Sequence, residues 1–391
     1  MAVMLNAPRR RVTFIDHTAM LGGAELSLCN LVALLDRARW QPSAVLGEPG
    51  PLATRLESLG APVTILQMSP SLRALRRSQV GSIRQLNPRM NFALLRHIGR
   101  LTSELRASRP ALVHANSLKA CVLGGLAGRL AGIPVVWHVH SIVSERKMRP
   151  TAVRMMRGLS RWLPDWIICN SRATAECFAD SSRVTVIPCG VETTLFHPNG
   201  RRGGEATRIG MIARFSPEKG QHLLLDAAER LCRVRTEVEY VFAGAAFFGE
   251  GRYEEQIRSR AQRGPLAERV RFAGFVDDVP SLLRDLDIIV HPSVEPEGFG
   301  QIVAEAMMAG KPVVVSAAGG SAELVEDGVT GRLVPPGDAG ALADAIAELL
   351  ASPTKAAEMG RRARQVALER YDIRKTTGAI EEVYERVLAR A

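Results

Sequence analysis

Short β-branched and apolar runs alternate along the chain with longer stretches of helical period. This alternation is typical of parallel sheets with crossover helices. In the first half, helices are predicted at Ala24–Leu35 and Leu118–Ala131, and strands at Arg11–Asp16, Ser43–Leu46, Val63–Leu66, Ala111–His114, Pro134–His138, Trp166–Cys169 and Val184–Ile187. The pattern therefore predicts a doubly wound α/β domain.

A break and a restart divide the chain. The segment His197–Ala206 holds a proline, an asparagine and three glycines, so it interrupts any regular element and is a natural linker. The alternation then begins afresh, with a helix from Gln221 to about Val234 and strands at Arg208–Ala213, Val238–Ala243, Pro312–Ser316 and Arg332–Val334. We predict two Rossmann-like domains, residues 1–197 and 207–370, followed by a C-terminal helix, 371–391, that packs back toward the first domain.

Composition supports a two-domain globular protein. The 391 residues are 46% apolar and 23% charged, and either half can bury a full core. No apolar run reaches the roughly 18 residues that a membrane-spanning helix needs, and none of signal-peptide length follows the N-terminus, so we expect a cytoplasmic protein. Without a C-x-x-C pair, the cysteines are interpreted as buried free thiols: Cys29, Cys121, Cys169, Cys177, Cys189 and Cys232.

Positive charge is concentrated in one stretch. From Gln67 to Asp165 there are 17 Lys or Arg against 3 Asp or Glu, a local +14 that exceeds the +11 of the whole chain. This asymmetry indicates an anionic partner, and the scarcity of aromatic residues disfavours nucleic acid. An anionic lipid surface fits better, because Met90–Arg106 has helical spacing of Phe92, Leu95, Ile98, Leu101 and Leu105, with Arg96, Arg100 and Arg106 among them. An ordinary surface helix is the alternative.

The loop after the predicted strand Arg208–Ala213 carries two cations. Arg214 and Lys219 stand five residues apart, directly before a predicted helix. At the carboxyl end of a strand they can converge on one diphosphate, and the N–H groups of the helix start add donors. A solvated turn with two surface cations is the alternative.

A second loop pairs carboxylates with glycines. The predicted strand Asp287–His291 leads to Glu297 and then to a predicted helix, Gly300–Ala309, which contains Glu305. Glycines at a helix start let a ligand approach the backbone amides, and carboxylates accept hydrogen bonds from sugar or ribose hydroxyls. The alternative treats Glu305 as a surface residue and Glu297 as a partner of the helix dipole.

Two weaker candidates lie in the first half. Gly22 and Gly23 form a turn that opens a helix, although G-x-G-x-x-G is absent. His138 and His140 end a predicted strand, and we expect one to contact a reacting sugar while the other points to the opposite face. A structural role is the commoner fate of any single histidine.

The run from Ile209 to Asp338 resembles family 4 of the glycosyltransferases. It carries RFSPEKG, EGFG followed by Glu305, AMMAGKPVVVSAAGGSAELV and DGVTGRLVPPGD. The first half adds weaker matches in MLGGAE, VHANS, VWHVHS, ICNS and VIPCGVETTLF. The resemblance implies a GT-B fold, with two Rossmann-like domains facing across a cleft, the donor in the second domain and the acceptor mostly against the first.

The resemblance also implies site roles and a retaining transfer of a hexose-type sugar from a nucleoside-diphosphate sugar, without a metal or other cofactor. Arg214 and Lys219 would hold the diphosphate, Glu297 the transferred sugar and Glu305 the ribose, while His140 would line the reacting centre. The donor-binding set would be completed by Gly23 near the phosphate, Gly274, Phe275 and Val276 against the base, and Gly298, Phe299 and Gly300 at the sugar.

Other functions remain open at this point. Asp285 and Asp287 match D-x-D, but they begin an apolar strand and are interpreted as structural. The basic first domain and its amphipathic helix favour an acceptor at the inner face of the membrane, a lipid-linked sugar or a growing surface polysaccharide. Residues 67–110, on the acceptor side, match no pattern of the family. A GT-B sugar-nucleotide epimerase, a phosphorylase and a non-catalytic nucleotide-sugar-binding protein are the alternatives. No lysine stands in a recognisable context for the cofactor that a phosphorylase needs.

Overall fold

The computed structural model describes residues 9–73, 75, 88–178, 181–198, 206–232, 237–247 and 249–390. The chain forms two compact units, Met1–Gly190 with Ile373–Ala391, and Val191–Asp372. The predicted linker His197–Ala206 falls within the second unit, and its residues 199–205 lie outside the described part of the chain.

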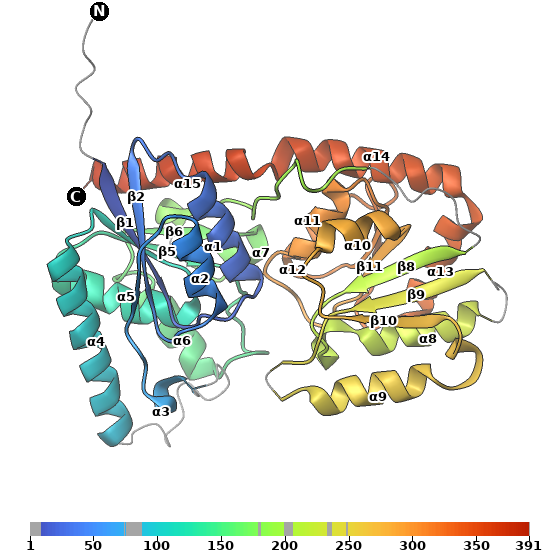
Figure 1. Cartoon of the computed structure of the whole chain (residues 1–391), viewed down its shortest axis with the longest axis horizontal. Helices are drawn as coiled ribbons and strands as arrows, with labels where there is room; N and C mark the ends of the chain where they lie inside the picture. The colour runs from blue at the N-terminus through green and yellow to red at the C-terminus, as the bar shows by residue number, and fades with distance from the viewer. Residues whose placement is uncertain are drawn as a thin grey trace, which may run out of the picture. The chain divides into compact units, whose positions relative to one another are not determined.

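The first unit is built on a seven-stranded parallel sheet in the order β3-β2-β1-β4-β5-β6-β7 (Figure 1). Its strands are β1 (Arg10–Asp16), β2 (Trp40–Leu46), β3 (Val63–Ile65), β4 (Leu112–Ala115), β5 (Val135–Val139), β6 (Trp166–Cys169) and β7 (Val184–Val186). Its helices are α1 (Gly23–Leu34), α2 (Pro51–Ser58), α3 (Pro70–Arg73), α4 (Pro88–Ser108), α5 (Leu118–Ala131), α6 (Pro150–Leu159), α7 (Arg172–Ala175) and α15 (Ile373–Leu388), with a 3₁₀ turn at Ser181–Arg183.

Alternate strand residues of this sheet face two different helix layers. On one face, Phe14, Val136 and their neighbours pack against α1, α2 and α15. On the other face, Ile15, Trp137 and their neighbours pack against α4, α5 and α6. Both faces are therefore buried, as parallel sheets require, and the last helix of the chain belongs to the core of the first unit.

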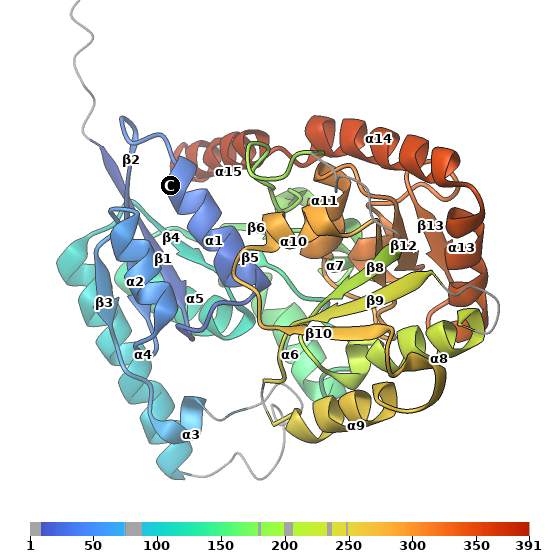
Figure 2. The ribbon, with the colours of Figure 1, turned by 45° about the vertical axis from the view of Figure 1, so that its right-hand side comes forward.

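The second unit contains a six-stranded parallel sheet in the order β10-β9-β8-β11-β12-β13 (Figure 2). Its strands are β8 (Thr207–Ile212), β9 (Val238–Ala243), β10 (Val270–Gly274), β11 (Ile288–His291), β12 (Val313–Ser316) and β13 (Arg332–Val334). Its helices are α8 (Gln221–Leu231), α9 (Gly251–Ala261), α10 (Val279–Asp285), α11 (Gln301–Met308), α12 (Gly319–Ala322), α13 (Ala339–Ala351) and α14 (Pro353–Arg370), with 3₁₀ turns at Pro217–Lys219 and Gly264–Leu266.

Helices α8, α9 and α13 cover one face of this sheet and share its main core, while α10 and α11 lie over the other face (Figure 2). The fold is thus α/β, with two doubly wound Rossmann-like sheets, as predicted. The predicted strands and helices are confirmed to within a few residues at each end, except that residues 233–236, at the predicted end of the Gln221 helix, lie outside the described ranges.

The apolar stripe predicted for Met90–Arg106 divides into two parts, which corrects the expectation of one amphipathic face. Ile98, Leu101 and Leu105 are buried in the first unit, whereas Phe92 and Leu95 are 66% and 68% exposed. Residues 98, 101 and 105 cluster around one side of the helix axis, and 92 and 95 lie on the solvent side. The lipid-facing interpretation now rests on those two residues alone.

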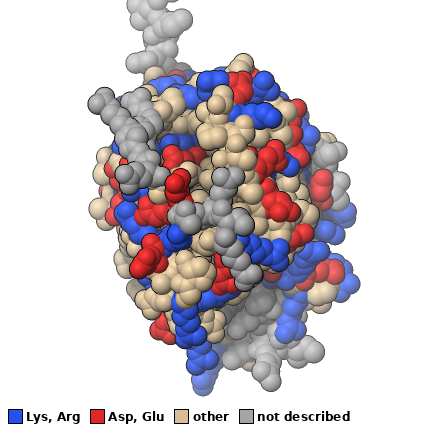
Figure 3. Space-filling model, turned by 90° about the vertical axis from the view of Figure 1, so that its right-hand side faces the viewer, with Lys and Arg blue, Asp and Glu red and all other residues tan. Residues whose placement is uncertain are grey.

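Charge is mixed on the face of the molecule seen in Figure 3, where Lys and Arg are interspersed with Asp and Glu. The basic stretch Gln67–Asp165 belongs to the first unit, although residues 74 and 76–87 of it lie outside the described ranges. Within those ranges, no helix combines the length and apolar character that crossing a lipid bilayer requires. All six cysteines are buried and none of them forms a disulfide, as predicted.

Candidate active site

The strand order reverses once in each sheet, and the candidate residues follow the strands at these two points. In the first sheet β1 lies between β2 and β4, and in the second β8 lies between β9 and β11. Loops after such a pair of strands run to opposite faces of the sheet and leave a crevice, where open α/β sheets bind ligands. Polar residues that follow β1 and β4, or β8 and β11, are therefore the ones to examine.

In the second unit, Lys219 and Glu297 meet across the two loops. Lys219 Nζ lies 2.8 Å from Glu297 Oε1, and both side chains are mostly buried. The loop of Lys219 is fixed to the other loop because Val294 N donates to Glu218 O at 2.9 Å. This juxtaposition of the two residues does not fit the solvated-turn alternative for Lys219.

Glu297 is held by more than the lysine. His291 Nε2 lies 2.9 Å from the same Oε1, and the hydroxyl of Ser293 also donates to it. Burial alone would raise the pKa of Glu297, but His291 and Lys219, through charge and hydrogen bonds, lower it well below its ordinary value. Glu297 is thus a fixed, ionised carboxylate, and its contacts converge on one oxygen.

Arg214 belongs to the same loop but pairs locally. Its guanidinium lies 2.5 Å from Glu218 Oε1, and its carbonyl accepts from Gln221 Nε2 at 2.8 Å. Gly220 turns the chain between Lys219 and α8 with φ of 83°, and a Cβ there would lie 2.1 Å from Pro292 O. The sequence therefore needs glycine at this turn to bring the β8 loop against the β11 loop.

Helix α11 begins directly after the glycines. Gly300 has φ of 93°, and a Cβ on it would lie 2.7 Å from the Cβ of Ser321. Phe299 is buried and packs edge-on against Tyr371, with ring centroids 5.9 Å apart. One turn into α11, burial raises the pKa of Glu305 to about 7, although Gln301 Nε2 donates to it at 3.0 Å. Glu305 is therefore no ordinary surface carboxylate.

Gly274, Phe275 and Val276 lie at the end of β10, two strands away from β8. Neighbouring strands are about 4.8 Å apart, so roughly 10 Å separates this loop from the β8 loop across the sheet. Phe275 is 59% exposed, and its ring lies edge-on to Phe247 at 6.2 Å. Both rings follow carboxyl ends of strands in the same sheet as Lys219 and Glu297.

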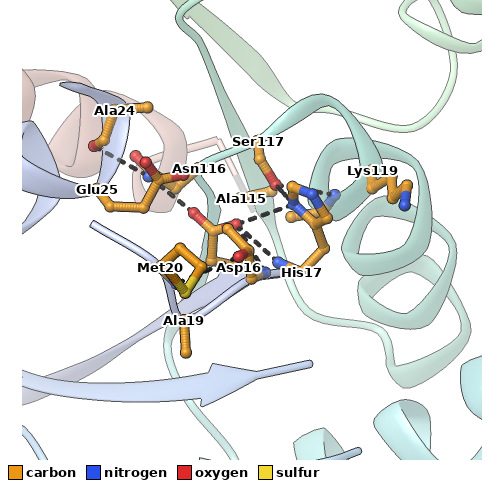
Figure 4. A network of polar contacts seen from close by, with 12 residues as sticks. Asp16, His17, Ala19, Met20, Ala24, Glu25, Ala115, Asn116, Ser117 and Lys119 are labelled. Atoms are coloured by element: carbon orange, nitrogen blue, oxygen red, sulfur yellow. Dashed lines mark hydrogen bonds and ion pairs between the residues drawn. The ribbon is translucent and has the colours of Figure 1, made fainter. Parts of the chain in front are cut away.

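In the first unit, a second polar group follows β1 and β4. Asn116 Nδ2 donates to Asp16 Oδ2 at 3.0 Å and to the carbonyl of Ala24 at 3.2 Å, as Figure 4 shows. Ala24 belongs to the first turn of α1, directly after Gly23, and a Cβ on Gly23 would meet no atom within 4 Å. The predicted turn is thus open to a ligand at Gly23, whereas the carboxylate of Glu25 covers Gly22 and accepts from its N–H at 3.1 Å.

His140 joins this group from the end of β5. Its Nε2 lies 3.0 Å from Asn116 Oδ1. Burial lowers the pKa of His140 to about 4, with the negative charge of Asp16 acting in the opposite direction. The imidazole is therefore neutral near pH 7.

The two histidines that end β5 lie on one side, and the expectation that they point to opposite faces is wrong. Their ring centroids are 4.0 Å apart. Side chains alternate with a period of two residues, so residues 138 and 140 share a face. His138 is buried, and its Nδ1 lies 3.2 Å from His114 Nε2, while His114 Nδ1 lies 2.7 Å from the hydroxyl of Tyr384 on α15.

Sequence reasoning did not select several residues of these groups. His291 ends β11 and Ser293 follows it, while Asp16 ends β1 and Asn116 follows β4. The feature of the sequence that could have identified them is a polar residue at the carboxyl end of a strand, in strands that lie side by side in the sheet. The order of the strands was not predicted.

Among the described residues, no group of three or more His, Cys, Asp or Glu side chains is arranged to hold a metal ion. Asp287 is structural, as interpreted from the sequence, because its Oδ2 accepts from Arg208 N at 2.8 Å at the start of β11. The residues assembled in the two units are instead suited to phosphate and hydroxyl groups.

Comparison with known proteins agrees with this chemistry. Residues 193–366 match the family model described as glycosyl transferases group 1, and residues 21–195 match glycosyltransferase family 4. A GDP-mannose-dependent alpha-(1-6)-phosphatidylinositol monomannoside mannosyltransferase of Mycolicibacterium smegmatis is 30% identical over 279 residues, which cover 66% of this chain and 71% of that relative. The chain belongs to the group 1 glycosyltransferases.

Two further proteins are similar to this glycosyltransferase. A phosphatidyl-myo-inositol mannosyltransferase of Mycobacterium leprae is 38% identical over 187 residues, which cover 46% of this chain and only 48% of that relative. The crystal structure of HepE from Anabaena in complex with UDP and glucose has a TM-score of 0.82 at 30% identity, covering 96% of this chain and 100% of that one. The glycosyltransferase therefore shares the GT-B architecture of its structural relatives.

Proposed function

We propose that this glycosyltransferase moves a hexose from a nucleoside-diphosphate hexose to a hydroxyl of a glycan or lipid-linked acceptor, with retention at the anomeric carbon. The observation that carries the proposal is the contact of Lys219 with the ionised Glu297 where the β8 and β11 loops meet. A cation and a carboxylate lie side by side there, and their chemistry suits phosphate and sugar hydroxyls respectively. The similar HepE was crystallised with UDP and glucose, and the mycobacterial relatives are named as mannosyltransferases.

Each side chain has a defined part in the proposed reaction. The bond between sugar C1 and the diphosphate oxygen breaks, the acceptor oxygen bonds to C1, and its proton leaves with the diphosphate or to solvent. Lys219 stays paired with Glu297 and still has N–H donors for the diphosphate. Arg214 supplies a second cation. Positive groups aimed at charge that develops on the leaving group are the main source of rate.

Glu297 orients the transferred sugar, and Glu305 accepts hydrogen bonds from the ribose in this proposal. The amides of Gly298, Phe299 and Gly300 face the same ligand, while Gly274, Phe275 and Val276 border the base. The first unit supplies the acceptor side, with Gly23 near the phosphate and His140 at the sugar. No divalent metal or other cofactor takes part, because Arg214 and Lys219 provide the positive charge.

Nucleoside diphosphate release is the test. UDP-glucose and GDP-mannose are incubated with the full chain and a lipid-linked or polysaccharide acceptor fraction, with and without a chelator. Release of the nucleoside diphosphate that depends on the acceptor and persists with the chelator supports the proposal. The new glycosidic bond should be axial by NMR, as the bond to the diphosphate is in the donor. Conversion of the donor sugar without release identifies an epimerase, binding without turnover identifies a non-catalytic protein, and an inverted product contradicts retention.

We also propose that the solvent face of α4 contacts an anionic membrane, where lipid-linked acceptors lie. Phe92 and Leu95 are exposed beside Arg96, and Arg89 and Arg100 are exposed on the same helix. Apolar side chains flanked by arginines suit the boundary between headgroups and acyl chains, and the cytoplasmic leaflet is anionic. The protein would then be peripheral at the cytoplasmic face.

Vesicle binding tests this contact. The chain should sediment with vesicles that contain phosphatidylglycerol at low salt, and a Phe92→Ser, Leu95→Ser variant should bind several-fold less. The matched control is Trp162→Ser, which removes a side chain that is 77% exposed outside α4. Equal binding of all three proteins, or binding to neutral vesicles alone, would remove the membrane from the proposal.

A further inference from the structure

Asn116 connects three segments of the first unit. It follows β4, is fully buried and lies between Asp16 at the end of β1 and Ala24 in the first turn of α1 (Figure 4). Its other amide atom, Oδ1, lies 3.0 Å from His140 Nε2. One side chain therefore joins the glycine turn, the β1 end and the candidate sugar-contacting histidine.

Chemistry fixes which way this amide points. Both groups near Nδ2, the carbonyl of Ala24 and the carboxylate of Asp16, can only accept hydrogen bonds while Asp16 is ionised. Burial alone would raise the pKa of Asp16, but hydrogen bonds and charge from His17, with Asn116 and Ser117, lower it below its ordinary value. The NH₂ group must face these acceptors, so Oδ1 must face His140.

An amide oxygen cannot donate, so the ring nitrogen that faces it has to carry a proton. We infer that Asp16, acting through Asn116, holds neutral His140 in the tautomer that is protonated on Nε2, so that Nδ1 presents a lone pair to the substrate. The thiol of Cys189 contacts Nδ1 with its Sγ 3.9 Å away, which makes it a weak and distant hydrogen-bond partner.

The tautomer of His140 follows from the structure alone, and only the contact of its Nδ1 with a substrate rests on the proposed function. In that setting a free hydroxyl of the transferred sugar donates to Nδ1, and His140 acts as a hydrogen-bond acceptor. Asn116 is then a positioning residue, since it acts through His140 and sets which group the imidazole can recognise. A sugar whose corresponding hydroxyl is replaced by an acceptor-only group would lose this contact.

The second oxygen of Asp16 explains why the carboxylate matters. Oδ1 accepts from His17 N at 2.7 Å and from Thr18 N at 3.4 Å, and it lies 3.1 Å from His17 Nδ1. In an Asp16→Asn variant these donors require oxygen at the Oδ1 position, so the new NH₂ would face the NH₂ of Asn116. Rotation of the Asn116 amide removes that conflict but brings its oxygen against the carbonyl of Ala24, so both amide orientations should be populated in this variant and His140 should show mixed tautomers.

Nitrogen NMR on the full chain labelled with ¹⁵N in its histidine rings tests this directly. Long-range proton–nitrogen correlations at about pH 8, above the ordinary pKa of histidine, distinguish the two neutral tautomers. His140→Gln assigns the signals by their loss. We expect the Nε2-protonated pattern for His140 in the native protein and a change to the Nδ1-protonated or mixed pattern in Asp16→Asn, while His222 of the second unit stays unchanged as an internal control.

A native His140 protonated on Nδ1 would overturn the inference, as would an unchanged His140 pattern in a folded Asp16→Asn variant. If that variant does not fold, Asn116→Ala serves instead, and its His140 should show mixed tautomers. With UDP-glucose or GDP-mannose, whichever is the better donor, Asn116→Ala should lower kcat about 10²-fold while the donor KM changes much less. Absence of turnover with the inferred tautomer present would refute the proposed function and leave the tautomer assignment standing.

Discussion

Lys219 and Glu297 neutralise each other in the structure, and the proposed function requires both to bind the donor. Lys219→Met would leave Glu297 with His291 and Ser293 as partners and remove a cation from the diphosphate. We expect kcat/KM to fall by about 10²–10³-fold, because one preorganised group that stabilises developing charge contributes about that much. Nucleoside diphosphate release measures it.

Arg260→Met is the control for Lys219→Met. Arg260 pairs with Asp226 and Glu229 on the surface of the same unit, with 36% of its own side chain exposed. Surface pairs contribute about 0–1 kcal/mol, so this variant should keep both activity and stability. Equal activity of the two variants would show that Lys219 does not act on the donor.

Glu305 should make the second unit less stable as the pH rises. Its pKa of about 7 in the folded protein lies above the ordinary 4.5, so the folded chain binds more protons between these values and the free energy of unfolding falls as the pH increases through them. Glu305→Gln should therefore stabilise the protein by roughly 1–3 kcal/mol at about pH 8 and by almost nothing near pH 4.5. Urea unfolding at both pH values measures this.

The same variant should weaken nucleoside diphosphate binding. An amide presents one oxygen where the carboxylate presents two, so it accepts the ribose hydroxyls less well. Calorimetric titration with UDP and GDP measures the loss. A Glu305→Gln variant that is more stable at about pH 8 and binds both nucleotides as well as the native chain would disprove the ribose role while upholding the pKa argument.

Single residues of the candidate site could be predicted from sequence where a loop carries its own chemistry. Lys219 and Glu297 were both selected, since each follows a predicted strand and adjoins glycines. His291 and Ser293 were not selected, because a histidine or a serine near the end of a strand is common. Their role depends on the β11 loop folding so that the side chain of Glu297 lies against them. That conformation is a tertiary property of the β11 loop.

Helix α15 is tied to the first sheet by one buried hydrogen bond, and this bond can be tested. The hydroxyl of Tyr384 lies 2.7 Å from His114 Nδ1, and both residues are fully buried. Tyr384→Phe would leave that nitrogen without a partner, so we expect a loss of about 1–3 kcal/mol in the free energy of unfolding. Urea denaturation of the full chain is the measurement.

Tyr240→Phe, in β9 of the second unit, is the matched control for Tyr384→Phe. Tyr240 is also fully buried, but among the described atoms its hydroxyl has no hydrogen-bond partner. Removing an unpaired buried hydroxyl should leave stability unchanged or raise it. If Tyr384→Phe were as harmless as Tyr240→Phe, the hydrogen bond to His114 would not help to hold α15.

At the scale of elements, hydrophobic periodicity predicted the strands and long helices well, because both sheets are buried on two faces and their strands are continuous apolar runs. It failed for the exposed end of α4. Phe92 and Leu95 follow the helical spacing of Ile98 but lie on the solvent side, because the buried side of these turns runs through Met90 and Leu94, and spacing alone does not show which of two overlapping apolar stripes is buried. The break before α15 was visible, whereas its hydrogen bond to His114 was not.

For the whole molecule, two α/β units followed from the restart of the pattern after residue 206. The sheet orders did not follow, because strand pairing between distant segments leaves no periodic trace in the chain. Those orders place β1 beside β4 and β8 beside β11, and this is what gathers Asp16 with Asn116 and Lys219 with Glu297. The candidate site is therefore a consequence of topology as much as of motifs.

The buried histidines of the first unit should make the molecule sensitive to acid. Burial lowers the pKa of His114 to about 3 and that of His140 to about 4, and it lowers that of His138 well below its ordinary value. Unfolded histidines titrate near about 6.5, so below that pH the unfolded chain binds more protons and the free energy of unfolding falls as the pH decreases. Each histidine should remove about 2 kcal/mol between about pH 7 and 5.

Glu305 makes the free energy of unfolding rise as the pH falls over part of this range, which opposes the effect of the histidines. The measurement is therefore made on the Glu305→Gln variant. There, the melting temperature of the transition assigned to the first unit should fall steeply from about pH 7 to 5. Adding Tyr384→Phe and His114→Phe together removes one titrating ring with its partner. The slope should then shrink but not vanish, because His97, His138 and His140 of the same unit also have a pKa lowered by burial. A melting temperature that stays level across this range would mean that these rings accept protons in the folded protein, and the neutral His140 required for the tautomer argument would be lost with it.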